Sequence, residues 1–144
     1  MNRRKQLILF RVLFVLYVTA VLLLCFLPMD DVSQFPRFVL GFPIDKVVHF
    51  CMFFPFPLLA FLAFDPYTDT VPSTLAFAGI TLMVGLLLAL GTEWGQEMLT
   101  DYRCGDPADL VADSLALVSS TVIVIIWDIL KQRLSRRSCE KASS

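Results

Sequence analysis

The chain has 144 residues, of which 57% are hydrophobic and 17% are charged, and its formal net charge is −1. This apolar composition excludes an intrinsically disordered protein, and the length argues against more than one domain. No glycine-rich phosphate loop, Ser/His/Asp signature or nucleic-acid-binding motif is present, so nucleic acid is not an expected partner.

Apolar runs with few charges predict four transmembrane helices, because a helix needs about 20 mostly apolar residues to cross the hydrocarbon core. We expect these helices at roughly residues 7–28, 46–64, 72–97 and 108–130. Open strands are excluded because unpaired backbone groups are costly in lipid, and residues 86–90 lack the alternation of a barrel strand. The predicted fold class is therefore all-α: a single polytopic membrane domain over residues 1–144, built as a bundle of four transmembrane helices in a lipid bilayer.

The first apolar run follows Arg3, Arg4 and Lys5, as in a secretory signal peptide. It is longer than the apolar region of such a peptide, and no small-residue cleavage site follows Pro28. We therefore predict that the run is a retained transmembrane helix.

The loop after the first helix carries Phe35, Phe38 and Phe42 at helical spacing, with Pro36 and Gly41 suited to open and close a short helix. An amphipathic segment on the outer membrane surface and an irregular loop with aromatic anchors both remain open.

Prolines and small residues predict how the later helices pack. Pro55 and Pro57 each remove a backbone hydrogen bond, so a kink is expected in the second helix. The third helix contains Gly91 and Gly95 in a GxxxG match. The fourth has a stripe of small residues four apart, namely Ala108, Ala112, Ala116 and Ser120. Such positions let helix backbones approach closely, either within one chain or in a homo-oligomer.

The charges predict the orientation of the chain. With four spans, both termini lie on one side, and this side carries nine basic and four acidic residues, a net +5. The other side carries three basic and nine acidic residues, a net −6. The positive-inside rule therefore places both termini in the cytoplasm, and the basic segment from Lys131 to Arg137 is expected to contact anionic lipid.

Three polar segments converge on the predicted outer face. They are residues 45–50 at the start of the second helix, residues 93–97 at the end of the third, and residues 103–113 leading into the fourth. Within them, Asp45 and His49, Glu93 and Glu97, and Asp109 and Asp113 are each four residues apart and share one helix face. His49 and Asp113 then lie about 6 Å deeper than their partners. A charge at that depth costs roughly 2–3 kcal/mol if it faces lipid, so we expect a shared polar pocket.

This arrangement resembles the VanZ-like family of bacterial integral membrane proteins. The resemblance covers roughly residues 43–120 and includes Asp45-Lys46 with His49-Phe50, Glu93 with Gln96, and Arg103 with Asp109. The family usually has Asn where this chain has Asp113, and often Gly where it has Ala116, so this pocket is the more acidic one.

The resemblance implies a cell-envelope protein of the bacterial cytoplasmic membrane, linked to resistance against teicoplanin-type glycopeptide antibiotics, and leaves the molecular activity undetermined. The expected ligand at the outer face is a lipid head group or a glycopeptide-like compound. The alternatives are a membrane-embedded hydrolase or transferase acting on a lipid head group, and a cation- or proton-coupled transporter. The residues expected to bind the ligand are Asp45, Lys46, His49, Glu93, Gln96, Arg103, Asp109 and Asp113.

Several roles stay open for the individual residues. His49 suits a structural hydrogen bond, acid–base chemistry or metal ligation, and His49 and Glu93 are the candidates for catalysis. A catalytic zinc site prefers several His or Cys ligands and the chain has one His, although a carboxylate-rich pocket suits a hard divalent ion. No cofactor or metal is assigned from the sequence.

Basic and capping residues near the pocket have simpler expected roles. Arg103 is expected to neutralise Asp109 or Glu93, or to bind phosphate. Lys46 is expected to extend to the membrane interface, and Asp106 to cap the fourth helix ahead of Pro107.

Overall fold

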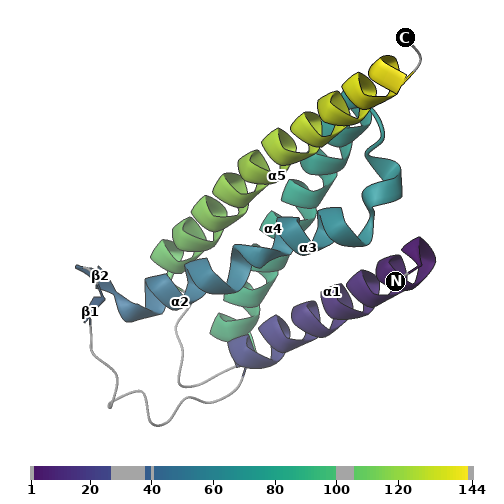
Figure 1. The fold of residues 1–144 in the computed structure, drawn as a ribbon. Helices are drawn as coiled ribbons and strands as arrows, with labels where there is room; N and C mark the ends of the chain where they lie inside the picture. The colour runs from purple at the N-terminus through teal and green to yellow at the C-terminus, as the bar shows by residue number, and fades with distance from the viewer. Residues whose placement is uncertain (1, 27–37, 40, 100–105, 143–144) are drawn as a thin grey trace.

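The computed structural model describes residues 2–26, 38–39, 41–99 and 106–142 (Figure 1). This part of the chain is almost entirely helical, and it contains four helical segments long and apolar enough to cross a membrane. The prediction of an all-α four-helix membrane protein is therefore confirmed. The helices are α1 (Arg3–Phe26), α2 (Ile44–Phe53), α3 (Pro55–Ala63), α4 (Val71–Leu99) and α5 (Pro107–Ala142).

The helices run alternately up and down, and this order brings distant polar segments to two ends of the bundle. At one end, which we call the site end, Lys46 near the start of α2 contacts Asp109 near the start of α5. At the opposite end, Asp65 follows α3 and is bonded by Arg3 of α1 and Lys131 of α5. Each end therefore gathers charged residues from several helices, whereas the middle of the bundle is mainly apolar.

The second membrane segment is interrupted at Phe54, between α2 and α3. Pro55 and Pro57 have no N–H to donate to the preceding turn, which explains why the helix breaks where a kink was expected. The Tyr17 hydroxyl of α1 donates a hydrogen bond to the Met52 carbonyl beside the break. A side chain from α1 therefore stabilises the junction that sets the direction of α2.

The segment before α2 is a short hairpin. Strands β1 (Phe38–Val39) and β2 (Phe42–Pro43) pair antiparallel, and Gly41 between them has a φ of +85°. Of the two alternatives that the sequence left open, the helical one does not hold over these strands, because the left-handed conformation of Gly41 reverses the chain. Phe38 and Phe42 are exposed, as aromatic anchors would be, whereas Phe35 and Pro36 lie outside the described residues.

The core forms where small residues of α4 and α5 meet larger side chains. Ala112, Ala116 and Ser120 of the predicted stripe are buried, although Ala108 is exposed. Among the glycines of α4, Gly85 is packed most tightly, because an added Cβ would lie 2.6 Å from Cδ2 of Leu117. The expected close approach at Gly91 is wrong, because this residue faces open space, and Gly95 meets the ring of Phe26. Gly85 therefore marks one close contact between α4 and α5.

Candidate functional site

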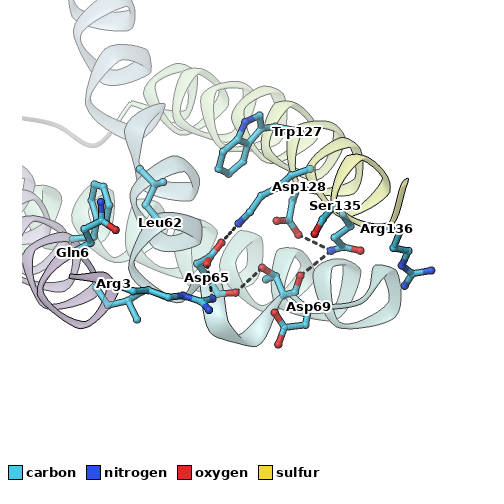
Figure 2. A pocket seen from close by; sticks show the side chains of 14 residues that line it. Arg3, Gln6, Leu62, Asp65, Asp69, Trp127, Asp128, Ser135 and Arg136 are labelled. Carbon is cyan, nitrogen blue, oxygen red and sulfur yellow. Dashed lines mark hydrogen bonds and ion pairs between the residues drawn. The ribbon is translucent and has the colours of Figure 1, made fainter. Parts of the chain in front are cut away.

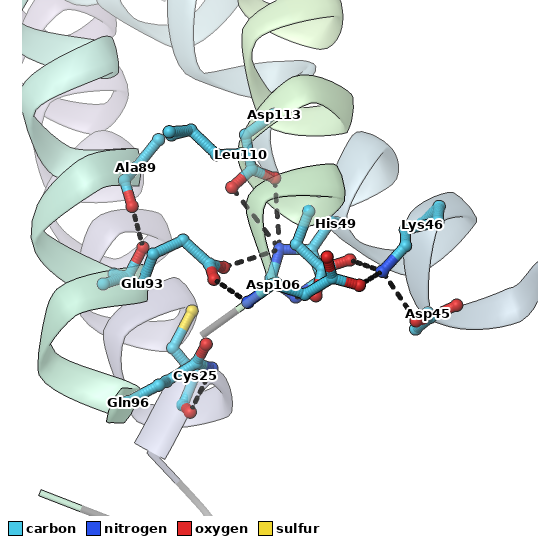
Figure 3. Close-up of polar contacts among 12 residues, drawn as sticks. Cys25, Asp45, Lys46, His49, Ala89, Glu93, Gln96, Asp106, Leu110 and Asp113 are labelled. Carbon is cyan, nitrogen blue, oxygen red and sulfur yellow. Dashed lines mark hydrogen bonds and ion pairs between the residues drawn. The ribbon is translucent and has the colours of Figure 1, made fainter. Parts of the chain in front are cut away.

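His49 lies among three carboxylates at the site end (Figure 3). Its side chain is 6% exposed, and its Nδ1 is 3.2 Å from Oδ1 of Asp113 and 3.7 Å from Oε1 of Glu93. On the other side of the ring, Nε2 is 3.8 Å from Oδ2 of Asp109. We call these four residues the His49 cluster; they come from α2, α4 and α5, as the helical spacing predicts.

Two of the carboxylates use one oxygen for a structural bond and turn the other toward His49. Oε2 of Glu93 accepts the backbone N–H of Asp106 at 3.1 Å, whereas its buried Oε1 has no hydrogen-bond partner among the described residues. Oδ1 of Asp109 accepts a hydrogen bond from Lys46 at 2.6 Å, and Oδ2 faces the imidazole. The backbone and Lys46 thus fix the carboxylates while leaving an oxygen of each beside the ring.

Lys46 is the cation that joins the cluster to the surface. Its ammonium group bonds Asp45 at 2.9 Å, Asp109 at 2.6 Å and also Asp106. The side chain is only 18% exposed, so the expectation that Lys46 extends to the membrane interface is wrong. Three carboxylates hold it in place because each one lowers the energy of the buried charge.

Asp106 caps α5, as predicted, and it has a second role. Its Oδ1 accepts the N–H of Ala108 at 2.9 Å, and its carbonyl accepts the N–H of Asp109 at 2.9 Å. Its Oδ2 binds Lys46. The hydrogen bond from Lys46, followed by the one from Ala108, lowers the pKa of the Asp106 carboxyl below its usual value. The sequence revealed the cap but gave no signal for this ion pair.

Six of the eight expected site residues come together in the part of the chain that the structure describes. Those that meet at the site end are Asp45, Lys46, His49, Glu93, Asp109 and Asp113. Gln96 is buried but donates its amide to the Cys25 carbonyl at 2.7 Å, which joins α4 to α1. Arg103 lies outside the described residues, so its predicted role stays a prediction.

An apolar cavity of about 350 Å³ adjoins the site end between α2 and α5. Lys46 lines it together with Phe42, Val47, Phe50, Ala112 and Leu115. A hydrocarbon chain bound there would have its polar end next to Lys46 and the carboxylates.

A second polar cluster at the opposite end was missed by the sequence reasoning (Figure 2). Asp128 is 2% exposed, and its Oδ2 accepts hydrogen bonds from Thr74 at 2.6 Å and Gln132 at 3.0 Å. It adjoins a cavity of about 720 Å³ that Arg3, Asp65 and Trp127 also line. The position of Asp128 inside an apolar run could have predicted this cluster, because an aspartate in a membrane-spanning segment is costly unless a polar partner faces it.

No protein-family model, curated protein or solved structure matches the chain. The VanZ-like assignment therefore rests on the sequence resemblance and stays a prediction.

The site end is built to receive positive charge. Five carboxylates, those of Asp45, Glu93, Asp106, Asp109 and Asp113, face one lysine and one histidine among the described residues. Lys46 is already bonded to three of them, so it has little capacity left for an added anion. The oxygens beside His49 suit a proton, an amine or a metal ion.

Proposed function

We propose that the chain is a VanZ-like cell-envelope protein that binds an envelope ligand at the outer face of the bacterial cytoplasmic membrane. Both termini are then cytoplasmic and the site end faces outward. The observation that carries the proposal is the meeting of His49, Glu93, Asp109 and Asp113, from three helices, in one buried acidic cluster. Keeping such residues in an apolar bundle is costly, and intramembrane ionisable groups commonly mark functional sites.

The chemistry of the site favours a ligand with a cationic group. Among the described residues the carboxylates outnumber the basic side chains, and Lys46 is bonded to Asp45, Asp106 and Asp109. An amine of a glycopeptide-like compound or of a lipid head group fits these oxygens better than a free phosphate does. The adjacent apolar cavity would take the acyl chain that teicoplanin-type compounds and lipids share.

Antibiotic susceptibility tests this proposal. A deletion strain would be complemented with the wild-type chain, with Glu93→Ala, or with Glu97→Ala, and the inhibitory concentration of teicoplanin measured. We expect the wild type and Glu97→Ala to restore resistance and Glu93→Ala to fail, because Glu97 is exposed on the same helix whereas Glu93 is buried beside His49. Equal susceptibility of all strains would remove the resistance function.

A second candidate function, hydrolysis or transfer at a lipid head group, is favoured by the contact between His49 and Asp113. The carboxylate of Asp113 is fully buried and lies 3.2 Å from Nδ1, so it can orient the ring and leave Nε2 to accept a proton. Comparing the membrane lipids of strains that carry the wild type and His49→Gln would test it. Loss of one lipid species and gain of its precursor in the variant is the expected result.

The transport alternative has less support. Between Asp113 and Asp128 on α5, Leu117 and Val124 are buried and apolar. The hydroxyls of Ser120 and Thr121 have no hydrogen-bond partner among the described residues. Leu117 and Val124 interrupt the polar groups between the two ends, with the hydroxyls of Ser120 and Thr121 between them, and this interruption disfavours a continuous path for protons or cations.

A further inference from the structure

We propose that His49, Glu93 and Asp109 bind a divalent metal ion at the site end. The three residues each offer one ligand atom, and these atoms lie within 4.8 Å of one another. They belong to α2, α4 and α5, so an ion held by them would link the three helices that form the pocket. The proposal gives the site a resident cation, which neither the sequence resemblance nor the proposed envelope function supplies.

The distances suit an ion after a small movement of the side chains. Nitrogen and carboxylate ligands lie about 2.0–2.2 Å from a first-row metal, so two ligands of one ion are at most about 4.4 Å apart. Nε2 of His49 is 3.8 Å from Oδ2 of Asp109, and the ligand atoms of all three residues lie within 4.8 Å of one another. A movement of the side chains by a few tenths of an ångström would bring these separations within the span of one ion.

Glu93 provides independent support, because it directs into the cluster an oxygen that makes no hydrogen bond with the described residues. The residue is 7% exposed, and its buried Oε1 makes no hydrogen bond among the described residues. Buried carboxylate oxygens normally accept hydrogen bonds or bind a cation. Oε2 is fixed by the N–H of Asp106, so Oε1 is the Glu93 oxygen that can bind a metal ion.

Asp113 supplies the supporting contact that metal-binding histidines usually have. A ligating imidazole commonly donates its second N–H to a carboxylate, which fixes the ring and strengthens the bond to the metal. Asp113 is completely buried and lies 3.2 Å from Nδ1. Nδ1–H would therefore donate to Asp113, and Nε2, which faces Asp109, would bind the ion.

The neighbouring acidic group is a poor metal site by the same reasoning. Asp45, Asp106 and Asp109 also bring oxygens within 4.8 Å of one another, but the ammonium group of Lys46 bonds all three. It fills the place that an ion would take. Lys46 is thus the cation of this outer group, whereas the carboxylates beside His49 have no lysine among them in the described residues.

The donor set favours Mn²⁺ or Zn²⁺ over Mg²⁺ or Ca²⁺. Carboxylates alone suit the hard ions, whereas an imidazole raises the affinity for first-row transition metals. Zinc binds more tightly in general, and Mn²⁺ accepts oxygen-rich sites readily. Mn²⁺ is also paramagnetic, which makes it the better probe.

The experiment uses the full chain purified in detergent and stripped of metal with a chelator. Mn²⁺ would be titrated and followed by electron paramagnetic resonance. We expect one saturable site, coupling of the electron spin to a ¹⁴N nucleus, and displacement by Zn²⁺ but not by Ca²⁺. Absence of saturable binding, or binding without ¹⁴N coupling in the folded wild-type protein, overturns the proposal without needing any variant.

Variants locate the site. His49→Gln should abolish the ¹⁴N coupling, and Glu93→Gln should abolish saturable binding while keeping the size of the side chain. Asp113→Asn should weaken binding by about tenfold, as the loss of a supporting carboxylate does. Two controls should bind normally, Glu97→Gln on the exposed face of α4 and Asp128→Asn at the opposite end. Equal loss in the controls, or normal binding by Glu93→Gln, contradicts the site.

The inference shares its site with the proposed function, and the two can fail separately. Metal binding is measured on purified protein, whereas resistance is measured on cells. A protein that binds Mn²⁺ but leaves teicoplanin susceptibility unchanged would keep the metal site and remove the resistance function. A protein that alters susceptibility without binding metal would do the reverse.

Discussion

Nδ1 of His49 and Oδ1 of Asp113 lie 3.2 Å apart although 64 residues separate them in the chain. Asp113 is completely buried, and His49 is nearly so. The contact joins α2 to α5 inside the bundle, at a depth where neither group can be satisfied by water. It therefore links the stability of the fold to the chemistry of the site.

The first prediction is that Asp113→Ala destabilises the protein more than a neighbouring surface change. Removing one member of a buried pair costs about 3–5 kcal/mol, because the other polar group is left without its partner. Thermal unfolding in detergent would measure the loss, with Glu97→Ala as the control. In a double-mutant cycle, Asp113→Ala should have a much smaller effect in a His49→Ala background. Additive effects would show that the two side chains do not interact.

A second prediction concerns the contact between α4 and α5. Gly85→Ala would place Cβ 2.6 Å from Cδ2 of the buried Leu117 and 3.3 Å from Phe56. Overpacking of this kind costs about 1–3 kcal/mol. The matched control is Gly79→Ala in the same helix, where nothing lies within 4 Å of the new atom, and its unfolding midpoint should stay equal or rise. A stable Gly85→Ala protein would mean that the helices pack less closely here.

A third prediction follows from the lowered pKa of the Asp106 carboxyl. A carboxyl whose pKa is lower in the folded state contributes stability at neutral pH, and this contribution is lost as the pH falls through the folded-state pKa. Lys46→Met removes the hydrogen bond that is the main cause of the lowering, so the pKa of Asp106 should rise toward the ordinary value of about 4. A ¹³C titration of the labelled carboxyl group measures it. An unchanged titration midpoint would show that Lys46 is not the cause.

The fourth prediction tests the cluster at the opposite end. Asp128→Ala removes a buried acceptor of Thr74 and Gln132, and it should cost about 1 kcal/mol because both donors keep a backbone carbonyl as acceptor. Asp128→Asn keeps one acceptor oxygen and should cost less. The exposed Asp69 lines the same cavity, so Asp69→Ala serves as the control with little effect. Equal stability of all three variants would contradict the buried role of Asp128.

The fifth prediction concerns orientation in the membrane. Phe42 and Tyr67 are 65% and 63% exposed, and they lie at the site end and the opposite end. In a cysteine-free background, Phe42→Cys should react with a membrane-impermeant thiol reagent in intact cells. Tyr67→Cys should react only after the cells are opened. The reverse pattern would place the His49 cluster on the cytoplasmic side.

The sequence predicted the helices and most of the site because both depend on local rules. Apolar runs of sufficient length define the spans, and i, i+4 spacing places His49 below Asp45 and Asp113 below Asp109. The break at Phe54 follows from the prolines for the same reason. These features need no knowledge of which helices are neighbours.

Contacts between particular side chains were harder to predict. Lys46 was predicted to be an interface anchor because two of its three carboxylate partners could not be foreseen. These partners, Asp106 and Asp109, are 60 and 63 residues away in the chain. Gly91 matched a packing motif, although the neighbouring helix contacts Gly85 instead. Each error arose because spacing within a helix does not reveal the rotation of that helix against its neighbours.

The length of α5 has a practical consequence. Its 36 residues extend about 54 Å, whereas the hydrocarbon layer is about 30 Å thick. Several helical turns of α5 therefore extend beyond the hydrocarbon layer as a rigid rod. A reporter or affinity tag joined to this part of α5 would be held away from the bilayer surface. It could be detected there without disturbing the packing of the helices inside the membrane.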